Sequence, residues 1–280
     1  MEVFQFKKEL KNNITNLRRK GDIIGFVPTM GALHEGHRSL LRKCKNDNNI
    51  SICSIFVNPN QFNNKNDLKN YPRNLEKDLH IIEAEKFDFV FCPSEMEMYP
   101  EPDKRVFDFG KLGEVMEGKH RPGHFNGVAQ IVTKLFNDIK PGNAYFGEKD
   151  FQQLAIVKFL VRTLNLPVNI ISCPIVREAD GLAMSSRNLL LKPEERMNAP
   201  LISRTLFKAV EMQHEISVPL LIDWVIEQIN LSPYLKVEYF EIVNDLNLQP
   251  INDWNEKCNK VGCIAVKTST VRLIDNVRFG

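Results

Sequence analysis

The 280-residue sequence has no long apolar run, no C-x-x-C cysteine pair and almost no excess of charge of either sign. A membrane-spanning helix needs about 20 apolar residues in succession, and the polar start MEVFQFKKELKNN lacks the apolar core of a signal peptide. The 37 basic and 35 acidic residues leave a net charge of +2, which argues against a broad nucleic-acid or membrane-binding surface. The six scattered cysteines favour neither a zinc site nor a disulfide framework. We therefore expect a cytoplasmic protein that binds neither nucleic acid nor a membrane.

Short apolar runs alternate with helix-like segments through the first two-thirds of the chain. We predict strands at 22–28, 50–57, 87–92, 143–146 and 168–172, and helices at 3–19, 36–44, 74–84, 125–137 and 150–164. Alternation at this spacing predicts an α/β fold, a Rossmann-like parallel sheet with helices on both faces.

The pattern changes after Pro174. Helices are predicted at 193–213 and 218–230, and strands at 236–243 and 261–267. This order indicates a smaller C-terminal α+β domain. We expect a first domain at 1–175 and a second domain at 176–280.

The segment PTMGALHEGHRSLL, at 28–41, follows the first long strand and opens a helix, where an open parallel sheet binds its ligand. Gly31 and Gly36 allow a bound group to approach the backbone closely, and a helix start favours anions. His34 and His37 could donate hydrogen bonds to phosphate oxygens. By themselves, two surface histidines would be an equally good interpretation. A metal site is disfavoured because no third ligand has a suitable spacing.

Three further polar segments follow predicted strands. In VNPNQF, the amides of Asn58 and Gln61 suit the hydroxyl and carboxylate groups of a small acid, although the segment alone could be a plain turn. In FGEKD, Lys149 suits a triphosphate, and Asp150 could simply cap the next helix. In AMSSRN, the serine hydroxyls and the Arg187 guanidinium suit phosphate oxygens, although a solvated interdomain linker would have a similar sequence.

Together these segments resemble a single family. The H-x-G-H motif is similar to the signature of the nucleotidyltransferase superfamily. The segments SIFVNPNQF, DLKNYPR, GHFNGV, AYFGEKDFQQL, READGLAMSSRN and RLIDN follow in the order found in pantothenate synthetases, over nearly the whole chain. The resemblance implies ATP-dependent condensation of pantoate with β-alanine through a pantoyl adenylate, giving pantothenate, AMP and pyrophosphate. It also implies Mg²⁺ bound with ATP, and a homodimer.

The resemblance implies roles for individual residues. The catalytic residues would be His37, His34, Lys149 and Arg187. ATP would contact Met30, Gly31, Ala32, Leu33, His34, Glu35, Gly36, His37, Gly147, Glu148, Lys149, Asp150, Val176, Met184, Ser185, Ser186 and Arg187. Pantoate would contact Gln61, Gln153 and Asn58, and β-alanine would contact Gln61. No residue is assigned to a metal.

A few residues stand apart from this pattern. Gln130 lies where a small or β-branched residue is more usual, and Leu189 replaces a frequent aromatic residue. Arg121 could hold a substrate carboxylate or support a dimer contact, whereas His120 and His124 are interpreted as structural. None of these positions removes a group that the chemistry needs.

The sequence leaves two alternative functions. A nucleotidyltransferase could stop after transferring an adenylyl group to a phosphate acceptor, but the paired amides of Gln61 and Gln153 weigh against it. A non-catalytic adenylate sensor would be expected to lose residues such as His34, Lys149 or Arg187, and all are present.

Overall fold

The computed structural model describes residues 1–18 and 21–280, which form two compact units. The first unit consists of Met1–Phe109, Arg121–Glu148 and Ile156–Pro174, and the second of Gly110–His120, Lys149–Ala155 and Ile175–Gly280. The second unit therefore combines the C-terminal part of the chain with two short segments from its middle. The contiguous division at residue 175 that the sequence suggests does not include these two segments.

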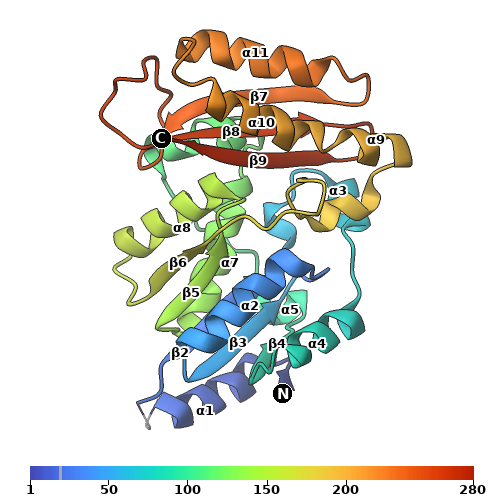
Figure 1. The fold of residues 1–280 in the computed structure, drawn as a ribbon. Coiled ribbons are helices and arrows are strands. Elements are labelled where there is room, and N and C mark those ends of the chain that lie inside the picture. The colour runs from blue at the N-terminus through green and yellow to red at the C-terminus, as the bar shows by residue number, and fades with distance from the viewer. Residues whose placement is uncertain (19–20) are drawn as a thin grey trace. The chain divides into compact units, whose positions relative to one another are not determined.

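A parallel sheet of six strands forms the centre of the first unit, in the order β1-β4-β3-β2-β5-β6 (Figure 1). Its strands are β1 (Glu2–Phe4), β2 (Ile24–Thr29), β3 (Ile50–Ile55), β4 (Phe89–Phe91), β5 (Asn143–Gly147) and β6 (Asn169–Cys173). The predicted Rossmann-like sheet is confirmed.

Helices cover both faces of this sheet. The helices of this unit are α1 (Lys7–Arg18), α2 (Glu35–Asp47), α3 (Lys65–Asn70), α4 (Leu75–Ala84), α5 (Glu95–Met98), α7 (His124–Ile139) and the greater part of α8 (Phe151–Thr163). Successive residues of β2 point to opposite faces, as strand geometry requires. The ring of Phe26 packs edge-on against Phe136 of α7, whereas Val27 belongs to a buried cluster with Leu41 of α2. No helix in the described part of the chain combines the length and apolar character needed to cross a bilayer.

The N-terminal segment differs from its prediction. The helix expected at 3–19 begins only at Lys7, because Val3 and Phe4 pair with Val90 and Phe91 as an edge strand. A strand of three residues shows no periodicity of its own, so it is detected only through its partner strand. Residue 19 lies outside the described residues.

The second unit is built on an antiparallel sheet of β7 (Lys236–Asn244), β8 (Lys260–Lys267) and β9 (Arg272–Phe279). Its helices are α6 (Met116–His120), α9 (Pro193–Asn198), α10 (Leu201–Glu211) and α11 (Val218–Asn230). Leu206 of α10 and Val225 of α11 are buried in one core with Phe240 and Ile264 of the sheet. The α+β character of this region is confirmed.

The sequence pattern did not reveal β9. Leu273, Asp275, Val277 and Phe279 are buried at alternate positions, but one of these is an acid, and Asn276 between them is buried as well. A carboxylate among apolar residues breaks the pattern expected from the sequence alone.

The topology of the first sheet determines where its functional loops lie. The chain passes from β2 to β3 on one side, and it later adds β5 on the other side of β2. Open parallel sheets bind ligands at the carboxyl ends of strands where the order reverses in this way. The loops that leave β2, β3 and β5 contain the H-x-G-H, VNPNQF and FGEKD segments.

Candidate active site

The two histidines of the H-x-G-H segment organise the start of α2. Nδ1 of His34, the N-cap residue, accepts a hydrogen bond from the backbone N–H of Gly36 at 3.1 Å, and Nδ1 of His37 accepts from the N–H of His34 at 3.3 Å. The ring centroids lie 4.1 Å apart. Because each Nδ1 accepts, a neutral ring carries its proton on Nε2 and presents an N–H donor there. With the partial positive charge of a helix start, the pair suits an anion.

A buried carboxylate holds the backbone of the same loop. Asp78 of α4 is 2% exposed and accepts hydrogen bonds from the N–H groups of Ala32 at 2.8 Å and Leu33 at 2.7 Å. Gly31 has φ +78°, and a Cβ there would lie 2.8 Å from the Asp78 carboxylate. Glycine therefore permits both the backbone conformation and the close approach. Asp78 was not identified from the sequence, although it lies one turn before the fully buried Ile82 and on the same helix face.

An ion-pair cluster joins the outer side of α2 to the end of α4. Glu85 bonds to Nε of Arg38 at 2.6 Å and to Nε of Arg42 at 3.1 Å. Burial alone would raise the pKa of Glu85, but the hydrogen bonds from the two arginines lower it below its usual value. The ionised cluster fixes α2, and with it the two histidines, against α4.

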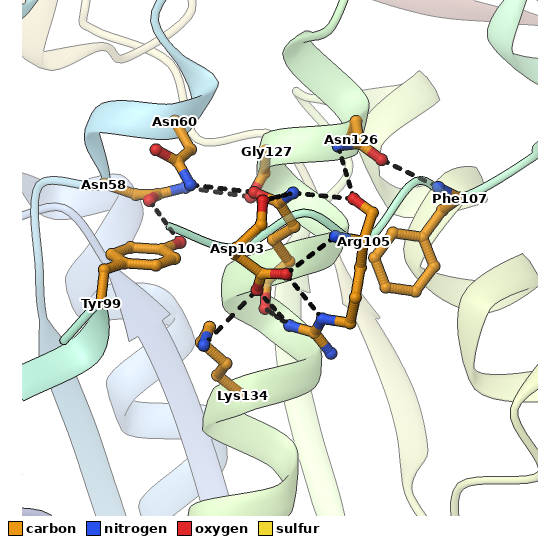
Figure 2. Close-up of polar contacts among 10 residues, drawn as sticks. Asn58, Asn60, Tyr99, Asp103, Arg105, Phe107, Asn126, Gly127 and Lys134 are labelled. Atoms are coloured by element: carbon orange, nitrogen blue, oxygen red, sulfur yellow. Dashed lines mark hydrogen bonds and ion pairs between the residues drawn. The ribbon is translucent and has the colours of Figure 1, made fainter. Parts of the chain in front are cut away.

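The amides of Asn58 and Gln61 form a second polar group in the loop after β3. Nδ2 of Asn58 donates to Oε1 of Gln61 at 3.2 Å. It also donates to the carbonyl of Gly127 at 3.0 Å, and the Tyr99 hydroxyl donates to Oδ1 of Asn58 at 2.8 Å (Figure 2). Burial raises the pKa of Tyr99, so its hydroxyl stays protonated as a donor. Nε2 of Gln61 lies 2.9 Å from Sδ of Met30, the first residue after β2. The amide loop is thus joined directly to the H-x-G-H loop.

Strand β5 pairs with β2 at Asn143 and Ala144, and its end leads into the FGEKD segment. Gly147 ends the strand, and the N–H of Glu148 donates to the carbonyl of Cys173 at 2.8 Å. The next two residues, Lys149 and Asp150, belong to the second unit. There Nδ2 of Asn276 donates to the Lys149 carbonyl at 3.1 Å, which fixes the backbone that carries the lysine.

An arginine–carboxylate pair anchors the polar loop that follows Pro174. The Arg177 guanidinium donates to both oxygens of Asp275, at 2.6 and 2.9 Å. Burial raises the pKa of Asp275, and the hydrogen bond and positive charge of Arg177 oppose that shift. The pair holds the beginning of the loop against β9.

The same loop then folds back on itself. The N–H of Met184 donates to the carbonyl of Val176 at 3.0 Å. Oγ of Ser185 accepts from the N–H of Arg187 at 3.2 Å and so caps the short 3-10 helix at Ser186–Leu190. The MSSR segment is therefore an ordered turn with its own capping residue.

The predicted site residues fall into two sets. The first unit holds Met30, Gly31, Ala32, Leu33, His34, Glu35, Gly36, His37, Asn58, Gln61, Gly147 and Glu148. The second unit holds Lys149, Asp150, Gln153, Val176, Met184, Ser185, Ser186 and Arg187. The contacts above bring together the histidine loop and the amide loop of the first set. The sequence could only place these loops at one edge of the sheet, and it missed Asp78 and Tyr99.

The buried Cys173 and the partly buried Cys92 are poor nucleophiles. Burial raises the pKa of Cys92 to about 12 and that of Cys173 to about 11, so both thiols stay protonated at neutral pH. Within residues 1–18 and 21–280, no three His, Cys, Asp or Glu side chains are grouped closely enough to share a metal ion.

Comparisons with known proteins agree across the whole chain. The family model described as pantoate-beta-alanine ligase matches residues 2–278. A pantothenate synthetase of Porphyromonas gingivalis is 51% identical over 279 residues, which cover 100% of this chain and 99% of the relative. A pantothenate synthetase of Caldicellulosiruptor saccharolyticus is 48% identical over 271 residues, 96% of each protein.

Solved structures give the same result. The crystal structure of pantothenate synthetase from Thermus thermophilus superposes with a TM-score of 0.93 at 39% identity, and the match covers 100% of both chains. The pantoate-beta-alanine ligase of Francisella tularensis, complexed with beta-gamma ATP and β-alanine, has a TM-score of 0.84 at 35% identity and covers 99% of this chain and 97% of its own. The chain described here belongs to the pantoate–β-alanine ligase family.

Proposed function

We propose that this chain joins pantoate to β-alanine with ATP, by way of a pantoyl adenylate, using the residues of the site described above. A free carboxylate is a poor acyl donor, so it must be activated before an amine can attack it. Transfer of AMP to the carboxylate provides that activation, because AMP is a good leaving group.

One contact supports this proposal above the others, the approach of Gln61 to Met30. Adenylation requires the carboxylate of the acid to lie within attacking distance of the α-phosphate of ATP. The Gln61 amide suits the hydroxyl groups of pantoate, and Met30 begins the loop whose helix start suits phosphate. Their contact at 2.9 Å supports the proposal, because it would bring the acid close to the phosphates of ATP.

In the first step a carboxylate oxygen of pantoate attacks the α-phosphorus of ATP. The bond to the bridging oxygen breaks, and pyrophosphate leaves. Negative charge accumulates on the non-bridging oxygens, and the Nε2–H groups of His34 and His37 would donate hydrogen bonds to it. We assign stabilisation of the triphosphate charge to Lys149 and to the turn that carries Ser185 and Arg187. In this interpretation the backbone of Val176 contacts the adenine.

In the second step the amine of β-alanine attacks the acyl carbon of the adenylate. The acyl–oxygen bond breaks, AMP leaves, and the nitrogen loses a proton as the amide forms. We assign Gln61 and Gln153 to pantoate and Gln61 also to β-alanine. The second domain would close over the site to exclude water from the reactive anhydride.

In this proposal Asn58 does not bind the substrate. Its side chain is 1% exposed, Nδ2 already donates to Gln61 and Gly127, and Oδ1 already accepts from Tyr99. An amide with these bonds has little capacity left for a ligand. We therefore propose that Asn58 orients Gln61 instead of contacting pantoate itself.

Mg²⁺ would enter the site with ATP. It would neutralise part of the triphosphate charge, and it usually keeps oxygen ligands from phosphates and water. The two histidines do not suit it as ligands, because each presents an N–H rather than a lone pair. We assign no protein ligand to the ion.

The proposal is tested by measuring AMP and pyrophosphate from ATP and Mg²⁺, with pantoate and β-alanine supplied singly and together. We expect pantothenate and AMP in equal amounts only when both substrates are present, and bound pantoyl adenylate with pyrophosphate when pantoate is alone. Transfer of the adenylyl group to a phosphate acceptor would indicate the nucleotidyltransferase alternative. ATP binding with no product in any combination would indicate the sensor alternative.

The expected assembly and location belong to the same proposal. A homodimer predicts about twice the 32.3 kDa mass of one chain in sedimentation equilibrium, and a single-chain mass would contradict it. The expected cytoplasmic location stays a prediction.

A further inference from the structure

One side of helix α7 lies against the loop that carries the proposed pantoate amides. Its residues recur every three positions, the spacing that places side chains on one helix face. They are His124, Gly127 and Gln130. The proposed site does not account for the polar side chains of His124 and Gln130.

Each of the three positions contacts a different part of the loop. Nδ1 of His124 lies 2.8 Å from the carbonyl oxygen of Gln61. The Gly127 carbonyl accepts the bond from Asn58 that was described above. Oε1 of Gln130 accepts from Nδ2 of Asn60 at 2.9 Å. The whole stretch 58–61 is therefore fixed to one rigid helix.

Gln130 uses both ends of its amide. While Oε1 accepts from Asn60, Nε2 donates to the carbonyls of Asp103 at 3.0 Å and Arg105 at 2.8 Å. The side chain is 4% exposed. A buried amide with these bonds is costly to replace, because an apolar residue leaves its partners unsatisfied. Gln130 thus joins two segments that are distant in sequence.

The segment around Asp103 is itself firmly fixed on α7 (Figure 2). The Asp103 carboxylate pairs with the Arg105 guanidinium at 2.6 Å and with Nζ of Lys134 at 3.4 Å. Hydrogen bonds from Arg105 hold the pKa of Asp103 well below its usual range, so this carboxylate stays ionised. Asn126 of α7 also donates to the Arg105 carbonyl at 3.1 Å and accepts from the N–H of Phe107 at 2.9 Å. Through Gln130, the loop at 58–61 is held by an element with little freedom.

We propose that Gln130 is a positioning residue for the pantoate side of the active site. It holds Asn60, and thereby the backbone that presents Gln61, at a fixed distance from α7. A small or β-branched residue, which the family resemblance leads one to expect at this position, could not form these bonds. The inference rests on the proposed function, since it assigns Gln130 an effect on pantoate rather than on ATP.

The first test compares Gln130→Leu with the matched variant Thr133→Val, one turn further along α7. The Thr133 hydroxyl is buried and has no hydrogen-bond partner among the described residues, so its removal disturbs no contact. For Gln130→Leu we expect KM for pantoate to rise about three- to tenfold, with KM for ATP and kcat within about twofold of wild type, as the loss of hydrogen bonds at one loop predicts. Thr133→Val should leave all three unchanged. An unchanged KM for pantoate in Gln130→Leu would overturn the proposal.

A double-mutant cycle tests whether the effect passes through Asn60. This side chain is exposed, so Asn60→Ala is tolerated by the fold and serves even if Gln130→Leu does not fold. We expect Asn60→Ala to raise KM for pantoate, and the double variant to be no worse than Gln130→Leu, because both changes break one contact. The proposed route would be contradicted if KM for pantoate in the double variant rose by the product of the two single effects. An unchanged KM in Asn60→Ala would contradict it as well.

Hydrogen exchange separates failure of this inference from failure of the proposed function. If wild type forms no pantothenate, the function is wrong, but the positioning role still predicts faster amide exchange at 58–61 in Gln130→Leu than in Thr133→Val. Equal exchange in the two variants would show that Gln130 does not position the loop.

Discussion

At the scale of single residues, the two histidines of the H-x-G-H segment combine two tasks. Their Nδ1 atoms accept backbone hydrogen bonds at the start of α2, and this fixes the proton of each neutral ring on Nε2. The bond that shapes the loop thus also sets the donor character of the ring. A residue that only capped the helix would not supply the donor, and a residue that only supplied the donor would not fix the loop.

His37→Ala tests the donor at this site. We expect adenylate formation to slow by ~10²–10³-fold, because one hydrogen bond to the developing phosphate charge is lost. Single-turnover release of pyrophosphate with pantoate and ATP measures this step. His214→Ala, at an exposed position in the second unit, is the control and should match wild type. A His37→Ala rate within a few-fold of wild type would remove the assignment.

The motif residues could be identified from the sequence, whereas the residues that hold them could not. A short motif such as H-x-G-H contains its own spacing. Asp78 acts on Ala32 across 46 positions and Gln130 on Asn60 across 70, and only the folded sheet brings these pairs together. Gln130 did stand out in the sequence, as a polar residue at a position expected to be small or β-branched. Its contacts give a physical reason for that departure.

At the scale of elements, the distance between α7 and the loop after β3 depends on Gly127. A Cβ at this position would overlap the carbonyl of Asn60 and the backbone nitrogen of Gln61. Helix and loop therefore meet backbone to backbone, with no side chain between them. This close approach is what allows the Gly127 carbonyl to accept the bond from Asn58.

Gly127→Ala should destabilise the fold, whereas the same replacement at an ordinary helical glycine stabilises it. In an open helix alanine stabilises by about 0.5–1 kcal/mol, but here overpacking should cost a net ~1–3 kcal/mol. Urea unfolding measures the difference, and KM for pantoate should rise with it. Asn137→Ala, at an exposed position of α7, is the control and should be neutral or slightly stabilising. A stabilised Gly127→Ala variant would show that helix and loop are not in close contact.

Apolar runs predicted most of the strands, and the exceptions have physical causes. The central strands β2 and β3 are buried on both faces, so their sequences read as nearly continuous apolar runs. Strand β1 is only three residues long, and β9 carries a buried acid whose partner, Arg177, lies 98 positions earlier in the chain. Local patterns contain no information about pairing over such a distance.

At the scale of the whole molecule, resistance to acid depends on carboxylates that are hydrogen-bonded only in the folded chain. Glu195 at the start of α9 is buried and accepts from the N–H groups of Lys192 at 3.0 Å and Ser269 at 2.7 Å. Burial alone would raise the pKa of Glu195, but hydrogen bonds from Thr270, Ser269 and Lys192 lower it to about 2. A carboxylate with a lowered pKa stabilises the fold above the pKa of the unfolded chain, and this contribution is lost as the pH falls toward the folded pKa.

Glu195→Gln should therefore reduce the acid sensitivity of unfolding. We expect the free energy of unfolding of wild type to exceed that of the variant by a constant amount above about pH 5. This difference should decrease by ~2–3 kcal/mol toward about pH 2. Urea unfolding between these limits measures it, and the other acidic groups, common to both proteins, cancel. Glu194→Gln, at the exposed neighbouring position, should show no such change. An advantage that does not vary with pH would contradict the role of Glu195.

The inclusion of Gly110–His120 in the second unit has a consequence for synthesis on the ribosome. Glu117 pairs with Arg272, 155 positions later, and its neighbour Met116 is fully buried in the finished protein. A nascent chain that has completed β6 contains all six strands of the parallel sheet, yet Glu117 still lacks its ion-pair partner. Translation must reach Arg272 before this ion pair can form. Chains that stop early will therefore leave this segment without its C-terminal partner, a difference that chaperones and proteases can use to distinguish unfinished from finished copies.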